Sequence, residues 1–223
     1  MVFESFFTLQ LLAMTYGYLS GFDYELTSWY MCAMMSLTVM WVDDVHFSYD
    51  VEYLSATIQP YDHMQELMIC IIGYLGVDLV MNPSNKIDAV AHHIESIGGL
   101  GLALYGRSVG ILNNCVRNEF STIFLALGTI CGKSKNKFLK QISPVFMLFF
   151  IPTFIWYRII PCTVMTFVMF SNLGSFINDY IDILHLLFYC THVILQYYWM
   201  SLIMRKVLRM VVPRNALNPE SAP

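Results

Sequence analysis

Seven apolar stretches constrain the fold of this chain more than any other feature, because each approaches the length of a helix that crosses a bilayer. Such a helix needs about 20 mostly apolar residues to span the hydrocarbon core. We therefore predict an all-α fold, a polytopic transmembrane helical bundle of about seven helices. The stretches are Val2–Ser20, Leu26–Val42, Met64–Met81, Val90–Gly106, Ile111–Cys131, Gln141–Phe170 and Ile181–Met204.

The composition supports a membrane protein. Of the 223 residues, 57% are hydrophobic and only 13% are charged, whereas soluble domains carry about 25% charged residues. The net charge of −4 gives no reason to expect a nucleic-acid partner. The six cysteines form no CxxC pair, so we expect neither a disulfide framework nor a structural zinc site.

The sixth stretch is longer than one crossing requires. Pro144, Pro152 and Pro161 can kink it. It is therefore either one kinked helix or a helix followed by a re-entrant piece, and the number of helices lies between six and eight.

Loop charges give this topology an orientation. Lys and Arg collect on the cytoplasmic side of membrane proteins, which predicts a lumenal N-terminus and a cytoplasmic C-terminus here. Residues 1–22 would form a first transmembrane helix, residues 23–210 the main bundle, and residues 211–223 a disordered cytoplasmic tail. Nine of the twelve basic residues fall on the predicted cytoplasmic side: Lys86, Lys133, Lys135, Lys137, Lys140, Arg205, Lys206, Arg209 and Arg214.

Ionisable residues at membrane depth are costly, so each one is a candidate for function. The fourth helix opens with KIDAVAHHIES, in which Asp88, His92, Glu95 and Ser96 share one helical face. A carboxylate beside an imidazole fixes its tautomer, which suits a general base or an acyl-accepting nucleophile. His93 points about 100° away, toward another helix. The alternative is that these groups only form interhelical hydrogen bonds.

The third stretch places Tyr74 and Asp78 on one face, with Asp78 at about the depth of His92. Asp78 either faces the histidine pair or reaches the lipid headgroups. We predict His92, His93, Asp88 and Asp78 as catalytic residues. His92 or His93 would deprotonate the acceptor or carry the acyl group, and Asp88 and Asp78 would orient the histidine.

Two further charges lie in apolar segments. Glu119 either lines a central cavity or pairs with Arg117 at the interface, and Arg158 needs a carboxylate or a lipid phosphate. For Arg158 we favour a structural ion pair.

The last stretch carries a polar and aromatic stripe at steps of three and four residues, so it should face the bundle interior. His185 lies near the leaflet opposite His92, which disfavours haem, and we predict no metal or cofactor. The stripe consists of His185, Tyr189, His192, Gln196 and Trp199. The predicted substrate-binding residues are Tyr74, Glu119, Arg158, His192, Gln196 and Trp199.

In order, the motifs GYLGVD, DAVAHHIES, NEFSTIFL, FFIPTFIWYR and QYYW resemble the TLC domain, named after translocation-associated membrane, longevity-assurance and ceroid-lipofuscinosis proteins. The resemblance covers roughly Tyr24–Arg209. It implies a six-helix bundle around a membrane-embedded cavity, preceded here by one extra helix. It also implies endoplasmic-reticulum or related membranes and work on lipids.

In the ceramide-synthase branch of that family, the histidine pair moves a fatty acyl group from acyl-CoA to a sphingoid-base amine, and His92 and His93 match it. The HDxxD-like element of that branch reads NEFST here, with Glu119 at the first acid and Thr122 at the second. The chain is therefore more similar to the short TLC-domain-containing proteins, which influence phospholipid or sphingolipid levels.

Three functions follow as expectations. The first is regulation of lipid composition through an intramembrane cavity, which the missing second acid favours. The second is an acyl-CoA-dependent N-acyltransferase that uses His92 and His93. The third is a cargo receptor or a subunit of a membrane complex. The expected partners are membrane lipids, acyl-CoA as a co-substrate, and a second copy of the chain or a larger assembly.

Overall fold

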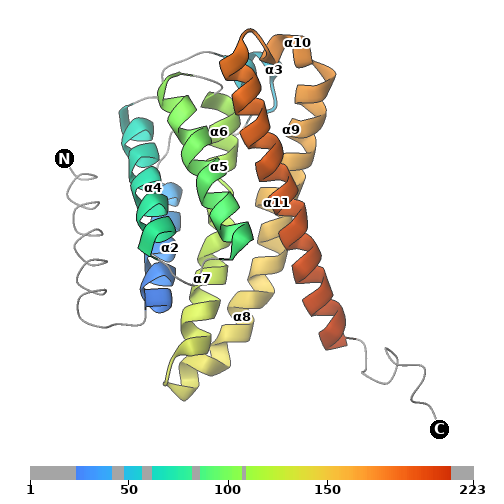
Figure 1. Ribbon diagram of the computed structural model, residues 1–223. Helices are drawn as coiled ribbons and strands as arrows, with labels where there is room; N and C mark the ends of the chain where they lie inside the picture. The colour runs from blue at the N-terminus through green and yellow to red at the C-terminus, as the bar shows by residue number, and fades with distance from the viewer. Residues whose placement is uncertain (1–23, 42–47, 57–61, 82–85, 107–108, 212–223) are drawn as a thin grey trace.

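The computed structural model describes residues 24–41, 48–56, 62–81, 86–106 and 109–211, and these form a helical bundle (Figure 1). The predicted first helix and the tail beyond Val211 lie outside the described residues. The helices are α2 (Tyr24–Trp41), α3 (Val51–Ser55), α4 (Asp62–Met81), α5 (Ile87–Leu104), α6 (Val109–Val116), α7 (Glu119–Lys133), α8 (Lys137–Phe154), the π-helix η1 (Ile155–Ile159), α9 (Ile160–Ser171), α10 (Leu173–Phe176) and α11 (Tyr180–Val211).

The predicted crossings from the second to the seventh are confirmed as helical, with two corrections. The fifth is not one uninterrupted helix, because it divides into α6 and α7 at Arg117 and Asn118. The re-entrant alternative for the sixth is wrong, because residues 137–171 form one continuous helix. Pro161 lacks the amide hydrogen that the carbonyl of Tyr157 would accept, and the wider π turn before it accommodates this loss.

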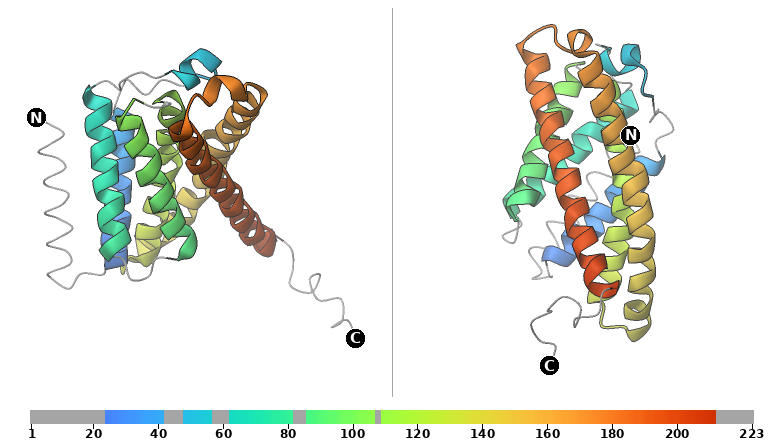
Figure 2. Two further views of the ribbon diagram at one scale, coloured as in Figure 1. Left: turned by 45° about the horizontal axis from the view of Figure 1, so that its top comes forward. Right: turned by 90° about the vertical axis from the view of Figure 1, so that its right-hand side faces the viewer.

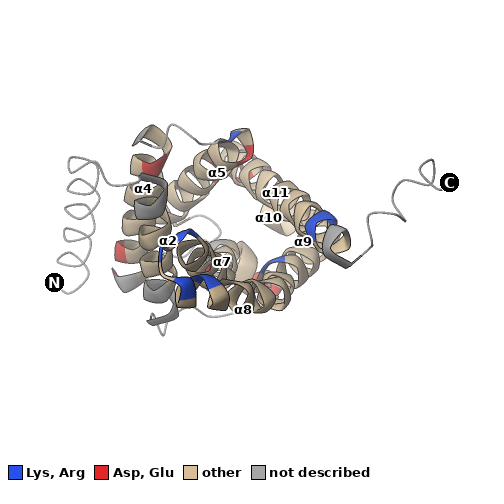
Figure 3. Cartoon of the chain, turned by 90° about the horizontal axis from the view of Figure 1, so that it is seen from below, with Lys and Arg blue, Asp and Glu red and all other residues tan. Residues whose placement is uncertain are grey.

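Seen along the bundle, α4, α2, α7, α8–α9, α11 and α5 surround a central region (Figure 3). The short helices α3 and α10 lie together at the end opposite the C-terminus of α11 (Figure 2). Small residues allow the closest approaches, as is common between membrane helices. A Cβ on Gly98 of α5 would lie 2.4 Å from the Phe188 ring of α11. Between α7 and α8, Ser143 donates a hydrogen bond to the carbonyl of Gly128.

The two ends of the bundle differ in charge. The end seen in Figure 3 carries exposed basic residues, whereas Asp50, Glu52 and Asp62 are exposed at the other end. Between the ends the outer surface is apolar, which suits contact with lipid tails. Phe167, for example, is 73% exposed. The described helices that are long and apolar enough on their own to cross a membrane are Lys137–Ser171 and Tyr180–Leu208. Among the side chains that the structure describes, the exposed basic ones are Lys86, Lys133, Lys135, Lys137, Lys140, Arg205 and Lys206.

Candidate functional site

A cavity of about 720 Å³ occupies the bundle interior, within the usual size range of small-molecule sites. Along α11 its lining residues run from His185 to Lys206, a distance of about 30 Å at the helical rise of 1.5 Å per residue. That length matches the thickness of the hydrocarbon core of a bilayer. The cavity is therefore long enough to hold a lipid chain along the bundle axis.

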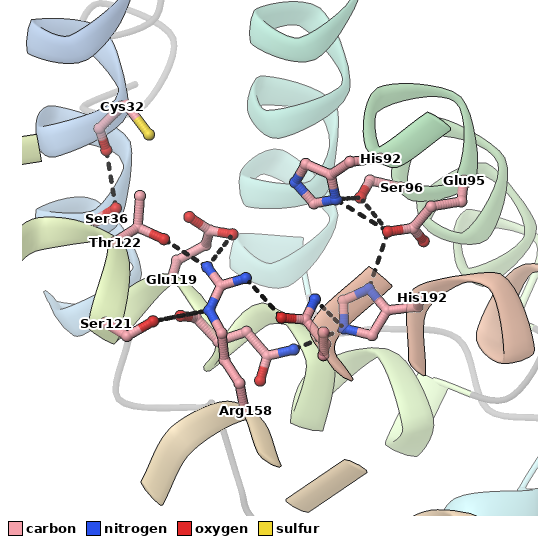
Figure 4. A network of polar contacts seen from close by, with 12 residues as sticks. Cys32, Ser36, His92, Glu95, Ser96, Glu119, Ser121, Thr122, Arg158 and His192 are labelled. Carbon is pink, nitrogen blue, oxygen red and sulfur yellow. Dashed lines mark hydrogen bonds and ion pairs between the residues drawn. The ribbon is translucent and has the colours of Figure 1, made fainter. Parts of the chain in front are cut away.

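Arg158 holds one side of the cavity through four hydrogen bonds (Figure 4). The side chain is buried and comes from the π turn η1, a type of turn that often occurs at functional sites. It also forms an ion pair with Glu119, at 3.7 Å between Nη2 and Oε1, which confirms the expected pairing with a carboxylate. Its hydrogen-bond acceptors are the Asn118 carbonyl (3.1 Å), Ser121 Oγ (2.7 Å), Gln196 Oε1 (3.0 Å) and Thr122 Oγ1 (2.6 Å).

The break between α6 and α7 supplies one of these acceptors. The amide of Asn118 bonds to the carbonyl of Cys115, and that of Ser121 bonds to the carbonyl of Asn118, so the chain makes tighter i→i+3 turns here. The carbonyl of Asn118 can then accept from Arg158 as well. The break that divides the fifth predicted helix is thus part of the site.

Across the cavity, Glu95 joins two histidines from different helices (Figure 4). Its Oε1 lies 3.0 Å from His92 Nδ1 on the same helix and 2.9 Å from His192 Nδ1 on α11. The Ser96 hydroxyl donates a further hydrogen bond to the same oxygen. A buried carboxylate therefore connects α5 to α11 beside the predicted catalytic histidine.

The second histidine of the pair points to another helix, as its helical angle predicts. His93 Nε2 lies 3.4 Å from Asp78 Oδ2 on α4. Asp78 also accepts a hydrogen bond of 2.6 Å from Ser28 of α2. The two adjacent histidines thus have separate carboxylate partners, Glu95 for His92 and Asp78 for His93.

The prediction that Asp88 orients His92 is wrong. Among the described residues, Asp88 accepts a 2.9 Å hydrogen bond from the Trp199 indole of α11, and Glu95 takes the position beside His92. Both carboxylates lie on the His92 face of α5, but Glu95 is three residues beyond His92, deeper in the bundle. Asp88, which is nearer the start of α5, instead bonds to Trp199 of the polar and aromatic stripe on α11.

The structure gathers the predicted residues around one cavity but leaves their roles as predictions. The stripe on α11 faces inward as expected, with His185, Tyr189, His192 and Gln196 buried. Asn118 was not among the predicted site residues, although it is the first residue of the NEFST motif. Its Nδ2 lies 2.7 Å from His192 Nε2. Apart from Gln196, the predicted site residues all line the cavity: Tyr74, Asp78, Asp88, His92, His93, Glu119, Arg158, His192 and Trp199.

The atoms that His92, Glu95 and His192 could offer to a metal ion lie within 4.8 Å of one another. Two imidazoles and a carboxylate are a donor set that suits zinc or iron. The hydrogen bonds to Glu95 already give all three groups partners. The expectation of a site without metal stays a prediction.

The TLC domain, the family of the translocation-associated, longevity-assurance and ceroid-lipofuscinosis membrane proteins, matches residues 6–205 of the 223. The chain belongs to the TLC-domain family. Membership makes it an integral membrane protein and points to a role in lipid metabolism or its regulation. No curated protein and no solved structure matches the chain.

Proposed function

We propose that this TLC-domain protein is an intramembrane acyltransferase that moves a fatty acyl group from acyl-CoA to a lipid amine. The observation that carries the proposal is His92, whose Nδ1 bonds to Glu95 while its ring lines the lipid-sized cavity. Such a pairing fixes the orientation and the tautomer of an imidazole, as a general base requires. Within the described residues, Nε2 of His92 forms no hydrogen bond and is directed away from Glu95 (Figure 4).

The proposed reaction needs one base. The amine nitrogen attacks the thioester carbonyl carbon and forms the amide bond, while His92 Nε2 takes a proton from the nitrogen. The carbon–sulfur bond breaks, and the leaving CoA thiolate takes that proton back from His92, so the ring is neutral again and charge and atoms balance. General-base catalysis of this kind contributes about 10²–10⁴-fold to the rate.

The lining of the cavity suits both substrates. Asp78 and Asp88 are carboxylates that can accept hydrogen bonds from the neutral amine, and His93 Nε2 lies beside Asp78. Lys86 and Lys206 line the cavity at the basic end of the bundle, where the phosphates of CoA would meet positive charge. We assign this end to the cytosol, because basic residues favour that side, and the membrane to the endoplasmic reticulum or a related compartment.

The test is turnover by the purified protein in lipid nanodiscs. Acyl-CoA and a sphingoid base are supplied, and both CoA release and the amide product are measured. We expect His92→Gln to lower the rate by at least about 100-fold. The matched control is Ile94→Ala, because Ile94 is exposed on the outside of the same helix. Equal rates for wild type and His92→Gln would refute the proposal.

A second candidate is a regulator that binds a lipid in the same cavity without transforming it. Thr122 favours it, because this residue stands where the ceramide-synthase pattern has its second acid. Its hydroxyl is occupied by the Arg158 guanidinium. This function predicts a lipid that co-purifies with the protein and no covalent product in the turnover assay.

A further inference from the structure

The buried polar groups between Arg158 and His92 form a chain in which the direction of each hydrogen bond can be deduced. Arg158 is only a donor, and its Nη1 lies 3.0 Å from an amide atom of Gln196. That atom must be the carbonyl oxygen, so the orientation of the Gln196 amide is fixed. Gln196 is fully buried, and it has no solvent into which it could turn.

The fixed amide then determines the tautomer of His192. The NH₂ group of Gln196 lies 3.2 Å from His192 Nε2, and an amide NH₂ donates but does not accept. Nε2 must therefore carry a lone pair, and the ring hydrogen of His192 lies on Nδ1. The side-chain amide of Asn118 lies 2.7 Å from the same nitrogen, with its NH₂ group facing the lone pair.

The tautomer of His192 makes its Nδ1 a hydrogen-bond donor to Glu95, which keeps this carboxylate an acceptor for His92. His192 Nδ1–H donates to Glu95 Oε1 at 2.9 Å. An ionised carboxylate only accepts, so His92 Nδ1, 3.0 Å from the same oxygen, also carries a hydrogen. The Ser96 hydroxyl lies 3.2 Å from this nitrogen, but it donates its hydrogen to Glu95 Oε1 and can therefore only accept from His92. The neutral His92 ring then has its lone pair on Nε2, the nitrogen directed away from Glu95 (Figure 4).

We propose that Arg158, Gln196 and His192 are positioning residues that hold His92 in the tautomer with hydrogen on Nδ1 and a lone pair on Nε2. They act only through Glu95. This inference deepens the proposed function, on which its catalytic meaning rests, but the proton positions can be measured without turnover. It also gives the buried Arg158 a role beyond a structural ion pair.

The experiment uses ¹⁵N-histidine-labelled full-length protein in nanodiscs, with solid-state NMR distinguishing protonated from unprotonated ring nitrogens. The signals of His92 and His192 are assigned from His92→Gln and His192→Gln. In the wild type we expect both rings to be protonated on Nδ1 and unprotonated on Nε2. Gln196→Glu replaces the donor by an acceptor, so the His192 Nε2 signal should become that of a protonated nitrogen.

A matched control is Tyr197→Phe, next to Gln196 on the same helix. Tyr197 hydrogen-bonds to Thr163 at an exposed position, so its loss should leave both histidine signals unchanged. In the turnover assay, Gln196→Glu should lower kcat by about 100-fold with little change in KM for acyl-CoA. A packing defect alone would leave the histidine signals as in the wild type.

Two results would overturn the inference. One is a wild-type spectrum with an unprotonated Nδ1 on His92 or His192, including the case in which a stoichiometric metal ion is bound there. The other is a folded Gln196→Glu variant with unchanged His192 signals. If the wild-type signals are as expected but the protein shows no acyl transfer, the proposed function fails and the positioning chain stands. If Gln196→Glu does not fold, the protonation of Nδ1 and Nε2 in the wild-type spectrum still tests the inference.

Discussion

Replacing Arg158 by methionine should destabilise the bundle strongly, because four buried hydrogen bonds depend on this guanidinium. Hydrogen bonds between membrane helices contribute on average about 0.6 kcal/mol each, which sets a lower limit of about 2 kcal/mol. Removing one partner of a buried ion pair costs about 3–5 kcal/mol, but Glu119 is partly exposed and can be hydrated. We therefore expect Arg158→Met to lower the free energy of unfolding by about 2–4 kcal/mol.

The assay is reversible unfolding in detergent micelles, followed by tryptophan fluorescence. Arg205→Met is the matched control, because Arg205 is exposed at the basic end, and surface substitutions usually change stability by less than about 0.5 kcal/mol. Arg158→Lys should recover part of the loss, since it keeps the charge but not the planar set of donors. Equal stability of Arg158→Met and Arg205→Met would refute the reasoning.

Three further predictions concern packing and substrate binding. Gly98→Ala should destabilise the α5–α11 contact by about 1–3 kcal/mol, because its Cβ would meet the Phe188 ring. Gly101→Ala, with nothing within 4 Å, should be neutral or stabilise by up to about 1 kcal/mol; thermal unfolding compares the two. Lys86→Gln combined with Lys206→Gln should raise KM for acyl-CoA several-fold in steady-state kinetics at low salt. The difference should shrink near 1 M salt, where the Debye length falls to about 3 Å.

Much of the fold could be predicted from the sequence, because apolar length and helical periodicity depend on local residues. The inward stripe on α11 is an example, since spacings of three and four residues place its members on one face. The division of the fifth helix at Asn118 could not be predicted this way. At the break the Asn118 carbonyl accepts a hydrogen bond from Arg158, forty residues later in the chain, and this contact requires the tertiary arrangement.

The site shows the same limit. His92 and its helical face were evident, but two carboxylates on that face competed as its partner. Spacing alone does not decide between Asp88 and Glu95, because both lie about one turn from the histidine. The neighbouring helix decides, since α11 presents Trp199 to Asp88 and His192 to Glu95. Pairings between helices require the tertiary arrangement.

The central claim is that acyl transfer takes place inside the cavity, where His92 Nε2 takes a proton from the attacking amine nitrogen. The most direct measurement is a cryo-electron microscopy map of the protein bound to a non-transferable thioether analogue of acyl-CoA. We predict that the acyl chain lies in the cavity, and that the carbon replacing the thioester carbonyl faces His92 Nε2 with room for the amine nitrogen between them. An analogue bound on the outer surface, with the cavity closed by side chains around His92, would contradict the account.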